Sequence, residues 1–295
     1  MKILVTGARG QLGHDVCQEL TLRGHEAVGT DIDEMDITDV SSVENVTRAI
    51  HPDAVIHCAA WTDVDAAEEE ENQARVRQIN AVGTANVASI CQKLDIKMMY
   101  ISTDYVFDGQ GSTPWEPDCP DYKPLNVYGR TKLAGEQAVV KALDKFFIVR
   151  IAWVFGKNGK NFIRTMLHIG KNHNILKVVK DQIGTPTYTF DLAKLLADMI
   201  ETDKYGYYHA TNEGGFISWY DFATEIFRQA AALGHPEYDK DHLKVLAVTT
   251  EEYGLSKAAR PFNSRLNKDK LAACGFTPLP AWQDALHRYL TEIEI

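Results

Sequence analysis

The first 22 residues constrain the fold of this 295-residue chain more than any other segment. Residues 1–6 form a short apolar run rich in β-branched side chains, which is typical of a buried strand. The run leads into Gly7, Gly10 and Gly13, spaced as GxxGxxG, and a helical pattern of apolar residues follows. Glycines at such a turn let the backbone approach a pyrophosphate, and the helix N-terminus attracts its negative charge. The segment therefore predicts a dinucleotide-binding unit of strand, turn and helix.

The rest of residues 1–150 alternates strand-like apolar runs with helical patterns. Strands are predicted at 26–30, 54–60, 97–102 and 146–150, and helices at 41–50, 72–94 and 126–143. Such alternation is typical of an α/β protein with a Rossmann-like, doubly wound parallel sheet, whose ligands bind beyond the carboxyl ends of the strands. We therefore predict a dinucleotide-binding Rossmann domain over residues 1–150. Residues 151–295 are expected to form mainly a smaller C-terminal substrate-binding lobe, with some segments returning to the Rossmann domain.

Tyr128 and Lys132 lie four residues apart in the predicted helix 126–143 and therefore share one helix face. A neighbouring cation favours the phenolate, so we expect the pKa of Tyr128 to move down from about 10 toward the range of a general acid. Thr103 follows the predicted strand 97–102 and offers a hydroxyl able to hold a carbonyl oxygen. A YxxxK pair alone is weak evidence. Here it converges with the glycine turn on one edge of the predicted sheet, which indicates a proton-transfer site.

Asp31 follows the second predicted strand, eighteen residues after Gly13. An acidic residue at this place can accept hydrogen bonds from an adenosine ribose, and it repels the additional phosphate of NADP. Asp31 therefore favours NAD(H), whereas Arg9 in the glycine turn is a cation that could offset the repulsion. The sequence thus leaves the choice between NADPH and NADH open. Asp36 and Ile37 are expected to follow a short turn and to lie near the adenine.

Composition excludes several classes of function. Residues 1–150 carry 14 Lys and Arg against 24 Asp and Glu, whereas residues 151–295 carry 17 of each, so the net charge of −10 arises in the first half. Nucleic-acid binding needs a basic face, so no nucleic-acid partner is predicted. No apolar run reaches eighteen residues and no signal segment is recognisable, so we expect neither membrane association nor export. Five scattered cysteines indicate reduced thiols in a cytoplasm, and the ten histidines show no metal-binding spacing.

Longer motifs give the chain a resemblance to a known family. It resembles the extended short-chain dehydrogenase/reductase superfamily through GxxGxxG, the Ala59-Ala60 segment, Asn80, Thr103 and YxxxK. Within that superfamily it is similar, nearly end to end, to the dTDP-4-dehydrorhamnose reductases. The motifs are ISTDYVFDG (101–109), NVYGRTKLAGE (126–136), RIAWVFG (150–156), NFIRTM (161–166), DQIGTPT (181–187) and ARPFNSRL (259–266). The last three are not shared across short-chain reductases generally, so they carry the closer identification.

The resemblance implies an activity and a role for each catalytic residue. The family reduces the C4 ketone of dTDP-4-dehydro-β-L-rhamnose to dTDP-L-rhamnose with NADPH or NADH, so a dTDP-sugar is the expected substrate. Tyr128 would protonate the C4 oxygen as the general acid, and Thr103 would hydrogen-bond the ketone. Lys132 would hold the nicotinamide ribose and adjust the pKa of Tyr128. The resemblance also implies a homodimer and Mg²⁺, neither of which a motif in the sequence indicates by itself.

The same resemblance implies two sets of binding residues. Besides Tyr128 and Lys132, those expected to bind the cofactor are Gly7, Gly10, Gln11, Leu12, Gly13, Asp31, Asp36, Ile37, Ala59, Ala60, Thr62 and Ser102. Those expected to bind the substrate are Thr103, Asp104, Trp153, Gln182 and Arg260. Trp153 would pack on the sugar ring, and the planar guanidinium of Arg260 suits a diphosphate bidentately.

Three alternative functions share the predicted fold. Nucleotide-sugar 4,6-dehydratases resemble Thr-Asp-Glu at the active site, whereas this chain has Thr103-Asp104-Tyr105 and lacks the glutamate needed for water elimination. A 4-epimerase shares YxxxK and is not separated by that motif. A non-catalytic binding subunit, such as the regulatory β-subunit of methionine adenosyltransferase, also shares the fold, although the intact Thr103, Tyr128 and Lys132 favour an enzyme.

Overall fold

The computed structural model describes all residues from 1 to 295 and contains a central sheet of six strands in the order β10-β5-β4-β3-β1-β2. The strands are β1 (Lys2–Thr6), β2 (Glu26–Thr30), β3 (Ala54–His57), β4 (Lys97–Thr103), β5 (Phe146–Ile151) and β10 (Gly206–His209). Every neighbouring pair is parallel, which confirms the predicted doubly wound α/β sheet. The chain moves outward from β1 to β2 and then returns past β1 to β3. The crevice between β1 and β3 is therefore the switch point at which such sheets bind ligands.

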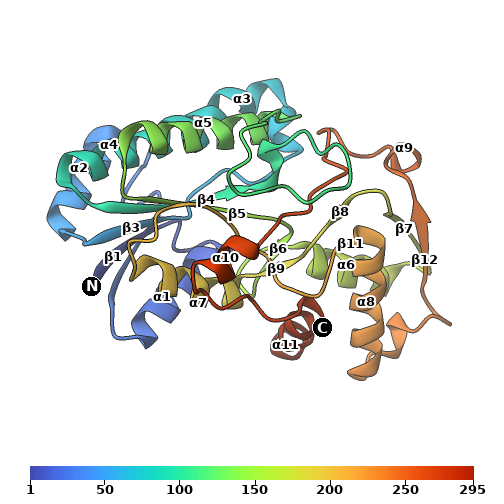
Figure 1. The fold of residues 1–295 in the computed structure, drawn as a ribbon. Coiled ribbons are helices and arrows are strands. Elements are labelled where there is room, and N and C mark those ends of the chain that lie inside the picture. The colour runs from blue at the N-terminus through green and yellow to red at the C-terminus, as the bar shows by residue number, and fades with distance from the viewer.

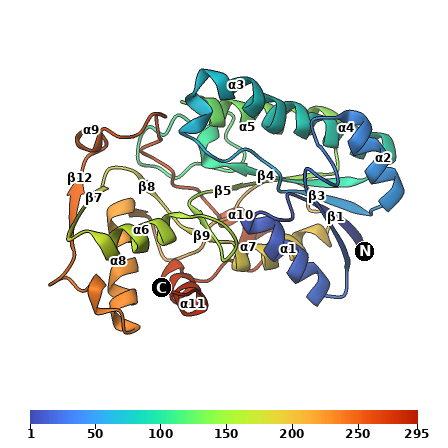
Figure 2. The same ribbon diagram turned by 180° about the vertical axis from the view of Figure 1, so that it is seen from behind.

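Helices cover both faces of this sheet (Figures 1 and 2). The helices α1 (Gln11–Leu22) and α7 (Thr189–Ile200) lie on one face, and α2 (Val40–Ile50), α4 (Thr84–Leu94) and α5 (Val127–Ala142) lie on the other. Because side chains alternate along a strand, Ile3 and Val5 join the apolar core under α1 and α7, whereas Leu4 joins the core under the opposite helices. The two cores hold the strands in register, so the loops at their carboxyl ends are fixed relative to one another.

The predicted helix 72–94 differs from the observed structure. It consists of α3 (Glu70–Arg77), a π-helical segment η2 (Gln78–Gly83) and α4. Asn80, inside the π-helical segment, is fully buried and its side-chain amide bonds the backbone N–H and C=O of Trp61. The wider turn therefore coincides with a side chain that fixes the loop following β3, and π-helical turns are common at functional sites.

The chain after residue 150 builds a second core and also returns to the sheet (Figure 1). The second core lies among α6 (Phe162–Asn172), α8 (Trp219–Ala232) and α11 (Trp282–Glu292). Its strand pairs are β6 (Val154–Phe155) with β9 (Thr187–Tyr188), β7 (Ile175–Val179) with β12 (Lys244–Val248), and β8 (Ile183–Gly184) with β11 (Ile217–Ser218). The short elements are α9 (Thr250–Tyr253), α10 (Asp269–Ala273), η1 (Ala66–Glu68), η3 (Asp104–Val106) and η4 (Pro236–Tyr238). Because β10 and α7 belong to the sheet layers, the division into lobes at residue 150 stays a prediction.

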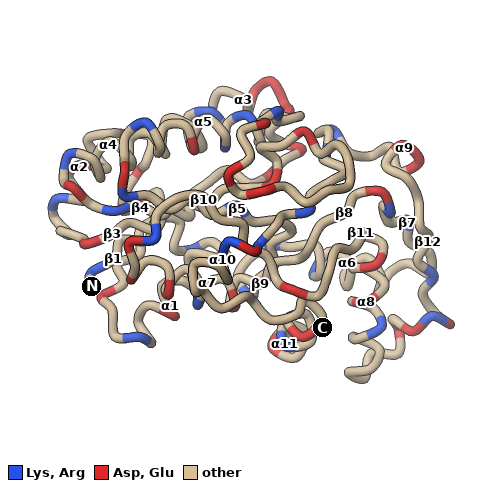
Figure 3. Tube along the Cα trace, in the orientation of Figure 1, with Lys and Arg blue, Asp and Glu red and all other residues tan.

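Charges of both signs are interspersed along both lobes (Figure 3). The acidic run Glu68–Glu71 spans the end of η1 and the first turn of α3, where negative charge suits the helix dipole. No helix is both long enough and apolar enough to span a bilayer.

Candidate functional site

The glycine turn between β1 and α1 packs directly against the loop after β3. Gly7 has a left-handed φ of 66°, and a Cβ atom built on it would lie 2.7 Å from the backbone nitrogen of Ala59. Gly10 is the N-cap of α1 and no side chain caps the helix, so the first N–H groups of α1 are left for a ligand. The turn thus has the two properties that a bound pyrophosphate needs, a close backbone approach and a free helix N-terminus.

The acidic residues beyond β2 are linked to the glycine turn. Asp31 accepts a hydrogen bond from the backbone nitrogen of Arg9 at 3.2 Å, and the Arg9 guanidinium pairs with Asp33 at 2.6 Å and also with Glu34. Arg9 is therefore engaged by two carboxylates. The carboxylate of Asp36 accepts bonds from the backbone and hydroxyl of Thr38. The choice between NADH and NADPH stays open on these contacts, because Asp31 still faces the cavity.

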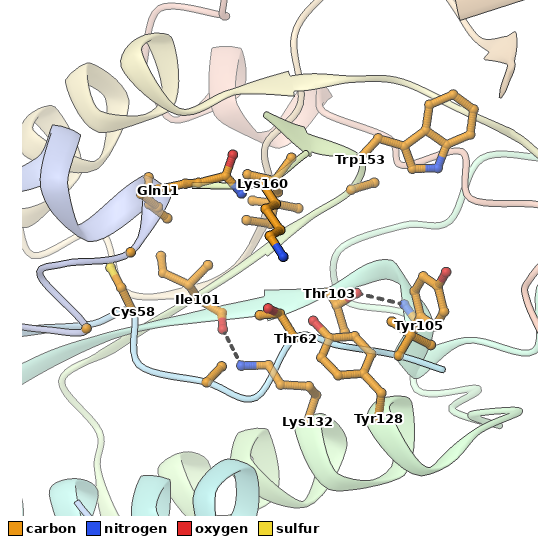
Figure 4. Close-up of a pocket in the computed structure, with 18 of the residues that line it drawn as sticks. Gln11, Cys58, Thr62, Ile101, Thr103, Tyr105, Tyr128, Lys132, Trp153 and Lys160 are labelled. Atoms are coloured by element: carbon orange, nitrogen blue, oxygen red, sulfur yellow. Dashed lines mark hydrogen bonds between the residues drawn. The ribbon is translucent and has the colours of Figure 1, made fainter. Parts of the chain in front are cut away.

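The helix α5 positions Tyr128 and Lys132 opposite the end of β4 (Figure 4). Asn126 caps α5 by accepting a hydrogen bond from Gly129 N at 2.7 Å, which fixes the first turn that carries Tyr128. Thr103, the last residue of β4, lies next to the phenol. The ammonium group of Lys132 donates to the carbonyl oxygen of Ile101 at 2.7 Å. The structure therefore brings together the three residues predicted to be catalytic.

The electrostatics of this group differ from the expectation for Tyr128. Burial raises the pKa of Tyr128 above its ordinary value, the neighbouring Thr103 hydroxyl lowers it, and the carboxylate of Asp104 raises it. The pKa of Lys132 is lowered to about 7, chiefly by burial, although the carboxylate of Glu136 raises it. The expected lowering of the Tyr128 pKa by Lys132 is absent, and burial instead raises that pKa. At neutral pH the phenol is therefore protonated and holds its proton tightly.

A single cavity of about 1090 Å³ unites the predicted residues of both sets. It runs from the glycine turn past the end of β4 to the second lobe, and it includes every residue predicted for the cofactor and the substrate. Asp104 is buried beside Thr103, and burial raises the pKa of its carboxyl group to about 6. No group of three or more His, Cys, Asp or Glu side chains could hold a metal. The Mg²⁺ implied by the resemblance stays a prediction.

Sequence reasoning missed two residues on the substrate side of the cavity, Asp65 and Trp219. The ring of Trp153, whose φ is 50°, stacks on Trp219 with centroids 3.7 Å apart. The guanidinium of Arg260 forms a bidentate pair with Asp65, at 3.0 and 2.7 Å. Asp65 follows β3, so the rule that ligands bind at the carboxyl ends of parallel strands could have indicated it. Trp219 begins α8 in the second lobe, and no local pattern placed it near Trp153.

The family follows from comparison with known proteins. The sequence matches the family described as RmlD substrate binding domain over residues 1–295. It is 39% identical over 293 residues to the dTDP-4-dehydrorhamnose reductase of Aggregatibacter actinomycetemcomitans, with 97% of each chain covered. It is 38% identical over 291 residues to the spore coat polysaccharide biosynthesis protein SpsK of Bacillus subtilis, covering 99% of this chain and 97% of that protein.

A solved structure agrees with this assignment and adds the cofactor. The crystal structure of dTDP-4-dehydrorhamnose reductase from Bacillus anthracis in complex with NADP superposes with a TM-score of 0.90 at 40% identity, covering 99% of this chain and 100% of that chain. The glycine turn described above fits such a dinucleotide, because its glycines let the backbone pack closely and no side chain caps the N-terminus of α1. The chain therefore belongs to the dTDP-4-dehydrorhamnose reductase (RmlD substrate binding domain) family and is an NAD(P)H-dependent oxidoreductase.

Proposed function

We propose that the protein reduces the C4 ketone of dTDP-4-dehydro-β-L-rhamnose to dTDP-L-rhamnose. The observation that carries this proposal is the continuous cavity in which Tyr128 and Thr103 lie between the glycine turn and the second lobe. A hydride donor and a nucleotide sugar can therefore reach one proton donor from opposite ends. In this proposal residues 1–150 supply the cofactor half of the cavity and residues 151–295 supply most of the sugar half. A homodimer and a cytoplasmic location stay predictions.

Each catalytic residue then acts on the ketone or keeps it in place. The reduced nicotinamide, when bound, would supply the hydride. Tyr128 holds its proton because burial raises its pKa, and it would release that proton only to the alkoxide that develops at C4. Thr103 would donate its hydroxyl to the same oxygen and keep it near the phenol. Lys132 would bind the nicotinamide ribose, and its charge would favour proton release from Tyr128 once the ligands exclude water.

The substrate residues divide the sugar nucleotide between them. Trp153, supported by its stack on Trp219, offers an aromatic face for the sugar ring. Asp104 and Gln182 would contact sugar hydroxyl groups. Arg260 would bind the diphosphate; its guanidinium also pairs with Asp65, and both residues line the cavity.

Arg260→Ala is expected to raise the KM for the dTDP-sugar by roughly tenfold to a hundredfold, as befits a lost charge-assisted bond. The Kd for NADPH should stay within about twofold of the wild-type value. Substitutions at separate sites usually act independently, so a change at the substrate end should leave coenzyme binding nearly unaffected. Steady-state kinetics and coenzyme fluorescence titration measure the two quantities. Arg130→Ala is the matched control, because Arg130 is an exposed residue of α5 outside the cavity. An unchanged KM would remove Arg260 from the substrate site.

The decisive test of the activity follows NAD(P)H absorbance with dTDP-4-dehydro-L-rhamnose, with dTDP-4-dehydro-6-deoxyglucose, and without sugar. Net oxidation with the first sugar supports the proposed reductase. Oxidation only with the second indicates a different nucleotide-sugar reductase. Interconversion of a 4-epimeric sugar pair without net oxidation indicates an epimerase, and binding without any turnover indicates a regulatory subunit.

A further inference from the structure

Lys160 is a cation in the cavity to which neither the sequence motifs nor the proposed mechanism gives a role. It lies in the loop between β6 and α6, and its ammonium group points into the open space between the glycine turn and the Thr103–Tyr128 pair (Figure 4). No hydrogen bond or ion pair involves that ammonium group, although acidic residues line other parts of the cavity. Lys160 is exposed to solvent where it lines the cavity, and an unpaired cation at such a place suits an anionic ligand.

The loop that carries Lys160 is fastened to the glycine turn. The side-chain amide of Asn158 donates to the carbonyl oxygen of Arg9 at 2.7 Å. The amide of Asn161 donates to the side-chain oxygen of Gln11 at 3.2 Å. Gly159 has a φ of 94°, and a Cβ atom there would lie 3.3 Å from the Gln11 side chain. Lys160 is therefore held beside the first residue of α1, next to the place where the helix N-terminus would receive a pyrophosphate.

The other cations of the cavity have partners or lie elsewhere. Arg9 pairs with Asp33 and Glu34. Arg260 pairs with Asp65, and Lys132 donates to the Ile101 carbonyl. Lys177 belongs to β7 in the second lobe. Lys160 is thus the one unpaired cation beside the glycine turn, where the two negative charges of a pyrophosphate would otherwise face only backbone dipoles.

We propose that Lys160 binds the pyrophosphate of the dinucleotide from the loop beside the glycine turn. It would neutralise charge that the helix N-terminus only partly balances, and it would link the first lobe to the loop that enters α6. The inference rests on the proposed function only in taking NAD(P)H as the coenzyme. It is independent of which sugar is reduced.

The test compares the wild-type protein with Lys160→Ala and Lys160→Arg by fluorescence titration with NADPH and with NADH, without sugar. Lys160→Ala should raise the Kd for both coenzymes by the same factor, about tenfold for a lost charge-assisted contact at a solvent-accessible site. It should also flatten the salt dependence of binding, because one screened attraction is gone. Lys160→Arg should restore most of the affinity. Lys157→Ala removes an exposed lysine of the same loop that does not line the cavity, and it should bind both coenzymes like the wild type.

Three outcomes would overturn the inference. A Kd raised for NADPH alone would place Lys160 at the 2′-phosphate rather than at the pyrophosphate. Unchanged coenzyme affinity with a raised KM for the dTDP-sugar would assign it to the diphosphate of the substrate. No change in the coenzyme Kd or in the KM for the dTDP-sugar would mean that Lys160 binds neither ligand. Because the titration contains no sugar, it also separates this inference from the proposed reduction, which is tested by turnover.

Discussion

Phe in place of Tyr128 is expected to lower kcat by about 10²- to 10⁴-fold, the usual contribution of a positioned general acid. NADPH should still bind, because only one hydroxyl group is removed and the ring keeps its edge contact with Tyr105 at 5.5 Å between centroids. The phenol is partly buried and its raised pKa keeps it protonated at neutral pH, so the wild-type enzyme begins each turnover with the proton in place. Steady-state kinetics with saturating sugar and coenzyme measure the loss.

Tyr105→Phe is the matched control for that experiment. It removes a partly buried phenol from the same cavity, but one whose hydroxyl is near Arg260 rather than Thr103. We expect its effect on kcat to be much smaller than that of Tyr128→Phe and to fall mainly on the KM for the sugar. Wild-type kcat in Tyr128→Phe would mean that another group supplies the proton. Asp104 would then be the next candidate, because burial raises the pKa of its carboxyl group to about 6.

Much of the fold and of the site composition follows from the sequence, because parallel sheets put the ends of their strands on one edge. The glycine turn after β1, Ala59 after β3 and Thr103 at the end of β4 are far apart in the chain. Each could be placed at the same edge once its strand was recognised, and all of them line one cavity. Helical spacing alone put Tyr128 and Lys132 on a common face of α5.

The contacts within the site could not be predicted, because they depend on tertiary packing. Asp65 and Arg260 are 195 residues apart and pair only because the second lobe returns to the loop after β3. The pKa of Tyr128 is set by burial, which a sequence motif does not report, and the direction of the Lys132 ammonium depends on the Ile101 carbonyl. Lys160 resembles any exposed loop lysine until the contacts of Asn158 and Asn161 fasten its loop to the glycine turn.

Gln in place of Glu136 is expected to lower the free energy of unfolding by about 3–5 kcal/mol, the range for breaking a buried ion pair by removing one partner. Glu136 on α5 and Arg150 on β5 have side chains that are 1% and 0% exposed. The carboxylate accepts bonds from Arg150 at 2.7 and 2.9 Å and from the Ser102 hydroxyl. The substitution leaves the guanidinium without its counter-charge, although it keeps bonds to the Pro117 carbonyl and the Tyr122 hydroxyl. Denaturant unfolding of wild type and variant measures the difference.

A second variant separates the charge from the packing. Glu136→Gln combined with Arg150→Met removes both charges and leaves an apolar chain among the rings of Phe107, Tyr122 and Tyr207 that surround the guanidinium. We expect the double variant to be more stable than Glu136→Gln, because the uncompensated buried charge is gone.

The single variant should also act on the site, since the negative charge of Glu136 raises the pKa of Lys132. Losing that charge lowers the Lys132 pKa further below about 7, so the alkaline limb of kcat/KM for the sugar should move to lower pH. A single variant as stable as the wild type, with an unmoved alkaline limb, would show that Arg150 and Lys132 do not depend on this carboxylate.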